Sequence, residues 1–171
     1  MGQPSTRGVV LVGHGGIPKD YPRELVTKLR GLEAKRRATG GLPTAEEVEL
    51  DTKLRRWPRT PATDPYKAGL ESLASQLNAS LNGDLFAIGY NEFCAPTVEE
   101  AVEELIAAGA TTITIVPSML TPGGSHSEIE IPETLQHLRD RHPGIELCYA
   151  WPFDLGQVAS MLAGQIQRFQ N

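Results

Sequence analysis

The stretch GVVLVGHGG at residues 8–16 decides the fold. Residues 9–12 are an unbroken run of valine and leucine, which is typical of a short strand that is covered on both faces of a parallel sheet. The glycines around His14 then end the strand with a turn. Because ligands gather beyond the carboxyl ends of the strands in an open parallel sheet, we expect His14 at the functional edge of the protein.

Three further apolar runs resemble residues 9–12, and segments with helical periodicity separate them. Strands that alternate with helices pair in parallel through right-handed crossovers, because a tight hairpin cannot join parallel neighbours. The sequence therefore predicts a single α/β domain over residues 1–171, with a four-stranded sheet between layers of helices. The expected strands are residues 8–12, 85–90, 112–116 and 145–151, and the expected helices are residues 21–37, 64–78, 97–109, 132–141 and 155–169.

Composition limits the classes of protein to consider. The 171 residues are 40% hydrophobic and 22% charged, which is enough material for one globular domain. A net charge of −5 argues against a nucleic-acid partner, because neutralising phosphates requires a dominant basic face. Neither a signal peptide nor a bilayer-spanning apolar run is evident, and Cys94 and Cys148 resemble small buried thiols. We therefore expect a cytoplasmic protein with reduced thiols and no membrane partner.

A long polar segment separates the first two expected strands. Residues 38–63 combine a Gly-Gly pair, several prolines and Trp57 with a short helix predicted to start near Thr44. Such a segment is more typical of a lid or an interaction surface than of a core. We therefore expect a flap at about residues 38–63, inserted into the α/β domain.

A metal site is predicted where three of the strands end. His14 follows the first strand, Glu92 follows the second, and His126 lies in a Gly-rich loop after the third. Each residue alone has an ordinary explanation, since a histidine can cap a turn and a loop histidine or glutamate can simply be solvated. Together, two imidazoles and one carboxylate suit Co²⁺, Fe²⁺, Ni²⁺ or Zn²⁺, with coordination positions left open for another molecule.

The Gly-rich turn at His14 does not predict nucleotide binding. The turn lacks the G-x-G-x-x-G spacing of dinucleotide-binding proteins, and no Gly-Lys-Ser or Gly-Lys-Thr sequence of a P-loop follows it. No nucleotide cofactor is therefore expected.

Three runs of sequence resemble the sirohydrochlorin chelatases of class II: VGHG at residues 12–15, the run from Glu92 to Ala101, and the run from Val116 to Pro132. The resemblance implies a flavodoxin-like three-layer sandwich with a four-stranded, mainly parallel sheet. It also implies an enzyme that inserts Co²⁺ or Fe²⁺ into sirohydrochlorin without ATP, in cobalamin or sirohaem biosynthesis. Because this chain holds one such unit, it resembles the short members that form homodimers, with residues 38–63 as an insertion.

The resemblance also assigns roles to individual residues. It makes His14, Glu92 and His126 the catalytic groups that handle the metal. Sirohydrochlorin is rimmed with carboxylates, which guanidinium groups bind in a bidentate manner. Two alternatives stay open, a protein that binds or delivers Co²⁺ or Ni²⁺ without chemistry and a chelatase for another porphyrin. The expected substrate-binding residues are Gly15, Gly123, Gly124, Ser125 and Arg59, and the further cationic candidates are Lys35, Arg36, Arg37, Arg55 and Arg56.

Overall fold

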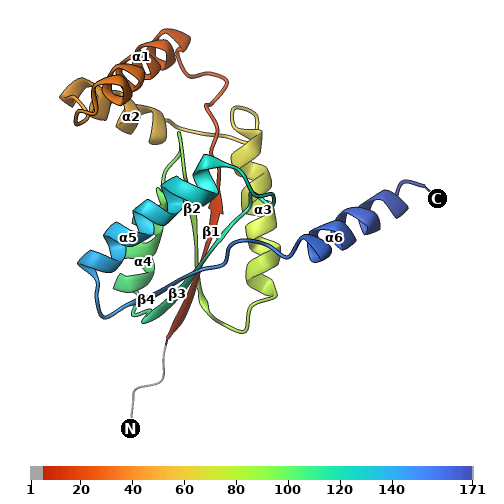
Figure 1. The fold of residues 1–171 in the computed structure, drawn as a ribbon. Helices are drawn as coiled ribbons and strands as arrows, with labels where there is room; N and C mark the ends of the chain where they lie inside the picture. The colour runs from red at the N-terminus through yellow and green to blue at the C-terminus, as the bar shows by residue number, and fades with distance from the viewer. Residues whose placement is uncertain (1–5, 171) are drawn as a thin grey trace.

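The computed structural model describes residues 6–170, which form a sheet of four strands (Figure 1). All neighbouring strands pair in parallel, in the order β2-β1-β3-β4, so the predicted α/β fold with a four-stranded parallel sheet is confirmed. The GVVLVG stretch lies in β1, one of the two inner strands, where Val10 lies between Ala87 and Ile115 of the neighbouring strands. The strands are β1 (Arg7–Gly13), β2 (Leu85–Tyr90), β3 (Thr112–Pro117) and β4 (Glu146–Tyr149).

Three helices begin at the side-chain caps that the sequence predicts, Thr44, Asp64 and Thr97. The Thr97 hydroxyl accepts a hydrogen bond from the Glu100 N–H, while the Glu100 carboxylate accepts one from the Thr97 N–H, which is the predicted capping box. Asp64 caps the third helix through its side chain. A π-helical turn, η1 (His126–Glu130), runs directly into α5. The helices are α1 (Arg23–Thr39), α2 (Ala45–Arg55), α3 (Pro65–Ala79), α4 (Val98–Ala107), α5 (Ile131–Arg141) and α6 (Leu155–Gln167).

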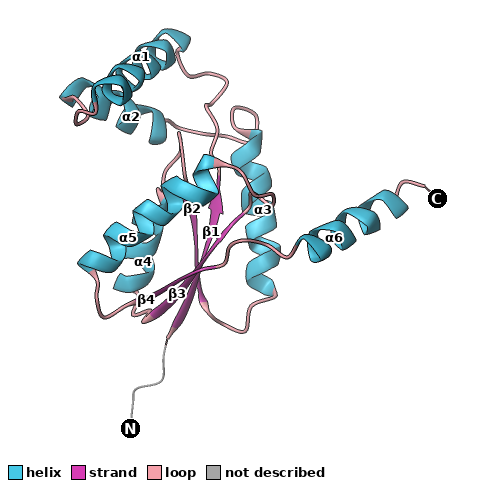
Figure 2. Cartoon of the chain, in the orientation of Figure 1, coloured by secondary structure: helices cyan, strands magenta, loops and turns pink. Residues whose placement is uncertain are grey.

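Helices cover both faces of the sheet, which gives the three layers that were predicted (Figures 1 and 2). Side chains alternate between the two faces along each strand. One set, with Ile113 and Ile115, packs against α4 and α5, and Leu135 and Leu138 of α5 are fully buried there. The opposite set, with Leu11, packs against α3. None of the helices within residues 6–170 is long and apolar enough to cross a membrane.

The last two elements differ from their predicted form. Strand β4 is shorter than residues 145–151, because its ladder with β3 runs only from Glu146 to Tyr149, and the Ala150 N–H adds a last hydrogen bond to the Ile115 carbonyl. Helix α6 forms where it was expected but contains no buried residue. Figure 1 shows α6 extending away from the sheet and its flanking helices.

The predicted flap is part of a helical hairpin with its own small core. Helix α2 packs against α1, which precedes the flap, and the hairpin buries Leu29, Leu50 and Leu54. Trp57 packs edge-to-face on Tyr21, with the ring centroids 5.0 Å apart. The sequence of residues 38–63 is largely polar because only one side of α2 is buried. Helix α1 extends to Thr39 and so runs into the start of the expected flap at about residues 38–63.

A buried ion pair joins this hairpin to the sheet. Arg59 and Asp64 form a salt bridge in which the two side chains are 5% and 3% exposed. The Arg59 guanidinium also donates to the backbone carbonyls of Gly16, Leu54 and Phe93. Arg59 was predicted to bind substrate, but its two terminal nitrogens are occupied inside the protein. The structure therefore gives this residue an anchoring role.

The two cysteines lie in different environments. Cys94 is 1% exposed, and burial raises the pKa of its thiol. Cys148 is exposed, so the prediction of a buried thiol is wrong for this residue. Its neighbour Leu147 points into the layer formed by α4 and α5, and strand alternation therefore turns Cys148 toward the opposite face of the sheet.

We expect Arg59→Ala to lower the free energy of unfolding by about 3–5 kcal/mol, because Asp64 would stay buried without its partner. Arg56→Ala is the matched control, since Arg56 and Glu100 form an ion pair whose side chains are 64% and 40% exposed. Exposed pairs contribute about 0–1 kcal/mol. Urea unfolding followed by circular dichroism measures both variants, and equal small losses would contradict the anchoring role.

Candidate metal centre

Three neighbouring strand ends supply the residues of the predicted metal site. His14 directly follows β1, Glu92 lies two residues after β2, and His126 begins η1 in the connection from β3 to α5. Because β1 lies between β2 and β3, these ends are adjacent. The segments that follow β1 and β2 remain paired beyond the strands, because the Glu92 N–H donates to the His14 carbonyl over 2.8 Å.

The three side chains converge on one point. One ligand atom from each of His14, Glu92 and His126 lies within 4.8 Å of the other two. The His14 Nε2 atom is 3.9 Å from a Glu92 carboxylate oxygen, and the two imidazole rings meet edge to face with centroids 4.6 Å apart. Two atoms bound to one ion at about 2.1 Å lie at most about 4.2 Å apart, so small side-chain rotations bring this set to coordination distance.

The second ring nitrogen of each histidine contacts an acceptor in the protein. His14 Nδ1 is 2.9 Å from the Gly15 carbonyl, and His126 Nδ1 is 2.9 Å from the Glu130 carboxylate. When Nδ1–H donates to such an acceptor, the lone pair on Nε2 is free for a metal. This contact favours the tautomer of His14 that ligates through Nε2. His126 Nδ1 faces an acceptor, the Glu130 carboxylate, and also a donor, the Asn91 amide nitrogen at 2.8 Å, so its contacts suit either tautomer.

Glu130 holds the His126 ring from behind. The carboxylate oxygen that accepts from His126 also accepts from the Asn91 side-chain amide over 2.9 Å. Burial raises the pKa of Glu130, but the hydrogen bonds from His126 and Asn91 outweigh it and leave this pKa below its ordinary value. Glu130 is therefore a carboxylate at neutral pH, and it orients the imidazole. Sequence analysis missed this pair, although the spacing of four residues between His126 and Glu130 would place them on one helical face.

Gly15 allows the first two strand ends to approach each other. Its φ is +95°, and a Cβ atom there would lie 1.8 Å from the Glu92 carbonyl oxygen. The space that the glycine leaves is therefore filled by the loop that carries Glu92, whereas the sequence suggested that substrate would fill it. The other predicted substrate contacts, Gly123, Gly124 and Ser125, lie exposed in the loop before His126.

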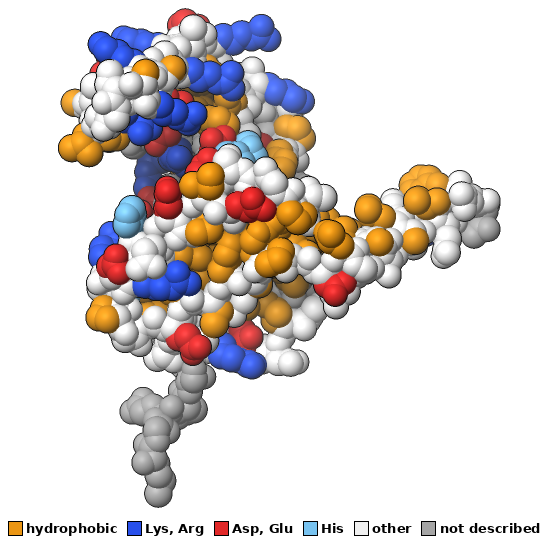
Figure 3. Space-filling model, in the orientation of Figure 1, with side chains coloured by type: hydrophobic (Ala, Val, Ile, Leu, Met, Phe, Trp, Pro, Cys, Tyr) orange, Lys and Arg blue, Asp and Glu red, His pale blue; other side chains and the backbone are white. Residues whose placement is uncertain are grey.

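The α1–α2 hairpin contacts the same Glu92 loop. The Ala95 N–H donates to the Arg55 carbonyl over 3.0 Å at the end of α2. The ring of Phe93, directly after Glu92, packs against the hairpin core. The inserted segment is thus built into the support of the site, and Figure 3 shows histidine and acidic side chains at the surface just below it.

An apolar cleft opens beside His14, between α3 and the end of β3. Its volume is about 610 Å³, within the range of about 300–1,000 Å³ for small-molecule pockets. Tyr66 joins the cleft to the site, because its hydroxyl accepts from the His14 backbone N–H over 2.8 Å. The sequence did not predict this wall of the cleft, because apolar residues at helical spacing are typical of a buried core. The cleft is lined by His14, Tyr66, Leu70, Leu73, Ser118 and Met119, among others.

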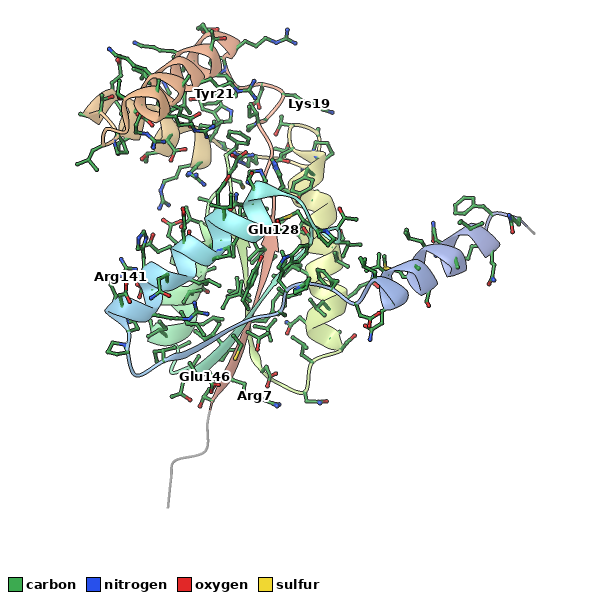
Figure 4. All side chains as sticks on the ribbon, in the orientation of Figure 1. Arg7, Lys19, Tyr21, Glu128, Arg141 and Glu146 are labelled. Carbon is green, nitrogen blue, oxygen red and sulfur yellow. The ribbon has the colours of Figure 1, made fainter. Side chains whose placement is uncertain are left out.

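Most of the predicted cationic candidates are engaged elsewhere. Arg36 pairs with Glu47, Arg55 with Asp51 and Arg56 with Glu100, while Lys35 and Arg37 lie exposed on α1. None of these five lines the cleft beside His14. Figure 4 places Lys19 on the connection between β1 and α1, and Glu128 on η1 near the strand ends.

Comparison with known proteins places the chain in one protein family. The profile of the CbiX family matches residues 62–169, a range that includes Glu92 and His126. A sirohydrochlorin ferrochelatase from Priestia megaterium is 38% identical over 66 residues, which are 39% of this chain and 24% of that protein. A sirohydrochlorin cobaltochelatase from Sulfurisphaera tokodaii is 29% identical over 85 residues, which are 49% of this chain and 67% of that protein. The match thus spans about a quarter of the Priestia protein.

A solved structure supports the fold over the full length. A crystal structure from Marinobacter aquaeolei, of a protein assigned to cobalamin (vitamin B12) biosynthesis as CbiX, superposes with a TM-score of 0.55. The superposition covers 99% of this chain and 100% of that chain at 18% sequence identity. At this identity the likeness concerns the arrangement of the strands and helices.

We expect Glu130→Gln to weaken Co²⁺ binding about 10- to 100-fold, because residues that orient a metal-binding histidine contribute on that scale. Glu128→Gln is the control on the same turn, since the Glu128 carboxylate accepts from the Gly123 N–H instead. Calorimetric titration with Co²⁺ measures both affinities. Unchanged binding by the Glu130 variant would show that the carboxylate does not orient His126.

Gly15→Ala should lower the free energy of unfolding by about 3 kcal/mol, because the alanine would adopt a strained backbone conformation and its methyl would overlap the Glu92 carbonyl. Gly124→Ala meets nothing within 4 Å and should be close to neutral. Thermal unfolding of the two variants gives the comparison. Equal stability would mean that the two strand ends do not need this close approach.

Proposed function

This chain belongs to the CbiX family of class II sirohydrochlorin chelatases, and from that premise we propose that it inserts Co²⁺ or Fe²⁺ into sirohydrochlorin. The observation that carries the proposal is the convergence of His14, Glu92 and His126 beside an apolar cleft. A ligand set alone would suit metal storage. A ligand set that borders a cleft large enough for an organic molecule suits transfer of the metal to that molecule.

Metallation of a tetrapyrrole makes two demands on the protein. The metal ion must lose water and reach the ring nitrogens, and the two pyrrole N–H groups must lose their protons. We assign the first task to Nε2 of His14 and Nε2 of His126, which hold the ion at the mouth of the cleft. Glu92 is an acceptor for the second task, and each histidine Nε2 becomes one as it releases the ion to the ring, because its lone pair is then free for a pyrrole proton.

The cleft supplies a surface for the flat macrocycle. Tyr66 and Leu73 of α3 form one wall, and Met119 after β3 lies across from them. Apolar contact would hold the ring, while the carboxylates at its rim would extend toward solvent. The exposed loop at Gly123 and Gly124 lies near this rim, in keeping with the substrate contacts that the resemblance implies; the Gly123 N–H donates to Glu128. No nucleotide takes part in this scheme.

The types of the three proposed ligands do not select between cobalt and iron. Two imidazoles and one carboxylate accept Co²⁺ and Fe²⁺ alike, and Ni²⁺ or Zn²⁺ as well. Relatives named for ferrochelatase and for cobaltochelatase activity both match this chain. We therefore propose both Co²⁺ and Fe²⁺ as substrates, with sirohydrochlorin as the acceptor, in cobalamin or sirohaem synthesis.

His14→Ala and His126→Ala should each slow metallation at least about 100-fold, the scale of losing a group that transfers protons or holds the ion. The assay follows the absorbance change when purified protein is mixed with Co²⁺ or Fe²⁺ and sirohydrochlorin. His142→Ala is the control, because His142 ends α5 and pairs with Glu103. If the wild-type protein does not exceed the spontaneous rate, the site stores or delivers metal instead.

A further inference from the structure

The charges of this chain are divided unevenly between the α1–α2 hairpin and the rest of the molecule. Residues 19–59, which include the hairpin, hold eleven of the 16 Lys and Arg residues but only seven of the 21 Asp and Glu residues. The hairpin is therefore basic, whereas the remainder of the chain is strongly acidic. Figure 3 shows Lys and Arg side chains gathered on the hairpin. A basic element on an acidic protein is the part of its surface that attracts an anionic partner.

The eleven cations of residues 19–59 fall into two groups. Five of them serve the fold through the salt bridges Lys28–Glu46, Arg36–Glu47, Arg55–Asp51, Arg56–Glu100 and Arg59–Asp64. The other six are all exposed and form no salt bridge with any residue that the structure describes. These six are Lys19, Arg23, Arg30, Lys35, Arg37 and Lys53.

Three of the six lie in a line along α1, which we call the arginine stripe. Arg23, Arg30 and Arg37 are seven residues apart, so each lies about 10.5 Å along the helix from the next and on nearly the same face. The positions between them on this face are Thr27 and Ala34, which are exposed and small. The three guanidinium groups therefore stand on a helix face that has no bulky or acidic side chain between them.

The acidic residues of α1 do not neutralise the arginine stripe. A carboxylate four residues from an arginine would be its natural partner on a helix, but Thr27 and Ala34 occupy those positions for Arg23 and Arg30. Glu33 is four residues before Arg37 and is half-buried. Burial raises the pKa of Glu33 more than the charge of Arg37 lowers it, so Glu33 is a weak partner.

We propose that the arginine stripe docks an acidic helix of a partner protein. Glutamates that recur every seven residues on such a helix would each meet one arginine, as charged residues do beside the seam of paired helices. Guanidinium groups bind carboxylates in a bidentate manner, which the ammonium group of lysine cannot do. Consistent with this, the unpaired cations off the stripe are lysines. The small side chains of Thr27 and Ala34 let the partner helix approach closely.

The distribution of charge favours an acidic protein over a nucleic acid. A nucleic acid is a long polyanion, and the acidic remainder of the chain would repel every part of it that extends past the hairpin. An acidic helix of limited length avoids this repulsion. Helix α1 has 17 residues, so it offers a docking surface about 25 Å long, which suits a partner helix of similar length.

A partner on the arginine stripe would lie beside the metal centre without closing it. None of residues 19–59 lines the cleft beside His14. The hairpin touches the Glu92 loop through the Arg55 carbonyl and through its own core, where Phe93 packs. The stripe is on the opposite, exposed side of α1. The inference goes beyond the proposed chelatase activity and does not depend on the metal chemistry.

Fluorescence anisotropy tests the stripe with a labelled probe, a helical peptide of alanine and glutamine that carries three glutamates at intervals of seven residues. The triple variant Arg23→Gln, Arg30→Gln and Arg37→Gln should bind this peptide at least about tenfold more weakly, because it loses three ion pairs at once. The triple variant Lys19→Gln, Lys35→Gln and Lys53→Gln is the matched control, since it removes the same charge from exposed positions off the stripe. Its binding should change less than about threefold, because salt screens charges that do not touch the peptide.

The same titrations at physiological salt decide against the proposal in three cases. Equal losses in the two triple variants would show attraction by net charge alone. Absence of binding by the wild-type protein, or equal binding of a peptide whose glutamates are spread around the helix, would show that the spacing of the stripe has no role. Tighter stripe-dependent binding of a short DNA duplex would identify a phosphate-binding surface instead. Thermal unfolding checks that both triple variants keep the fold, which we expect because all six side chains are exposed.

A charge exchange tests direct contact. Arg30→Glu places a carboxylate at the centre of the stripe and should weaken binding of the peptide at least about tenfold. A second peptide, in which lysine replaces the central glutamate, should bind the Arg30→Glu variant more tightly than it binds the wild-type protein. Failure of the second peptide to recover binding would contradict the docking geometry.

Discussion

The close approach of the carboxyl ends of β1 and β2 is the constraint on which the site depends. Gly15 adopts a φ of +95° against the Glu92 carbonyl, and the Glu92 N–H bonds back to the His14 carbonyl. These contacts fix the backbone of two proposed ligands, His14 and Glu92, relative to each other. The third proposed ligand, His126, lies in the connection that follows β3, on the other side of β1. The parallel order β2-β1-β3 therefore accounts for the meeting of residues that are far apart in the sequence.

Support for the site comes from elements outside the sheet. Glu130 and Asn91 hold the His126 ring, and the Tyr66 hydroxyl holds the His14 backbone. The α1–α2 hairpin packs on the Glu92 loop and is itself anchored by the buried pair of Arg59 and Asp64. Groups held in this way need little rearrangement when an ion arrives, which is the preorganisation that binding sites require.

Sequence alone predicted the features that follow from local chemistry. The β1 stretch and the capping box at Thr97 are local signals, and parallel topology brings His14, Glu92 and His126 together as the sequence predicted. The features that the sequence did not predict depend on which side chains become buried when the chain folds. Arg59 looks like any surface arginine, and Glu130 becomes a neighbour of His126 only when the loop is helical. Residues 38–63 read as polar because only one side of α2 is buried in the hairpin.

The most direct measurement is a crystal structure with Co²⁺ and anomalous diffraction at the cobalt edge. The geometry predicts a single strong anomalous peak, which marks one ion within bonding distance of Nε2 of His14, Nε2 of His126 and a Glu92 carboxylate oxygen. A peak elsewhere, or one that keeps its position and height in His14→Ala crystals, would contradict the central claim that these three residues bind one ion.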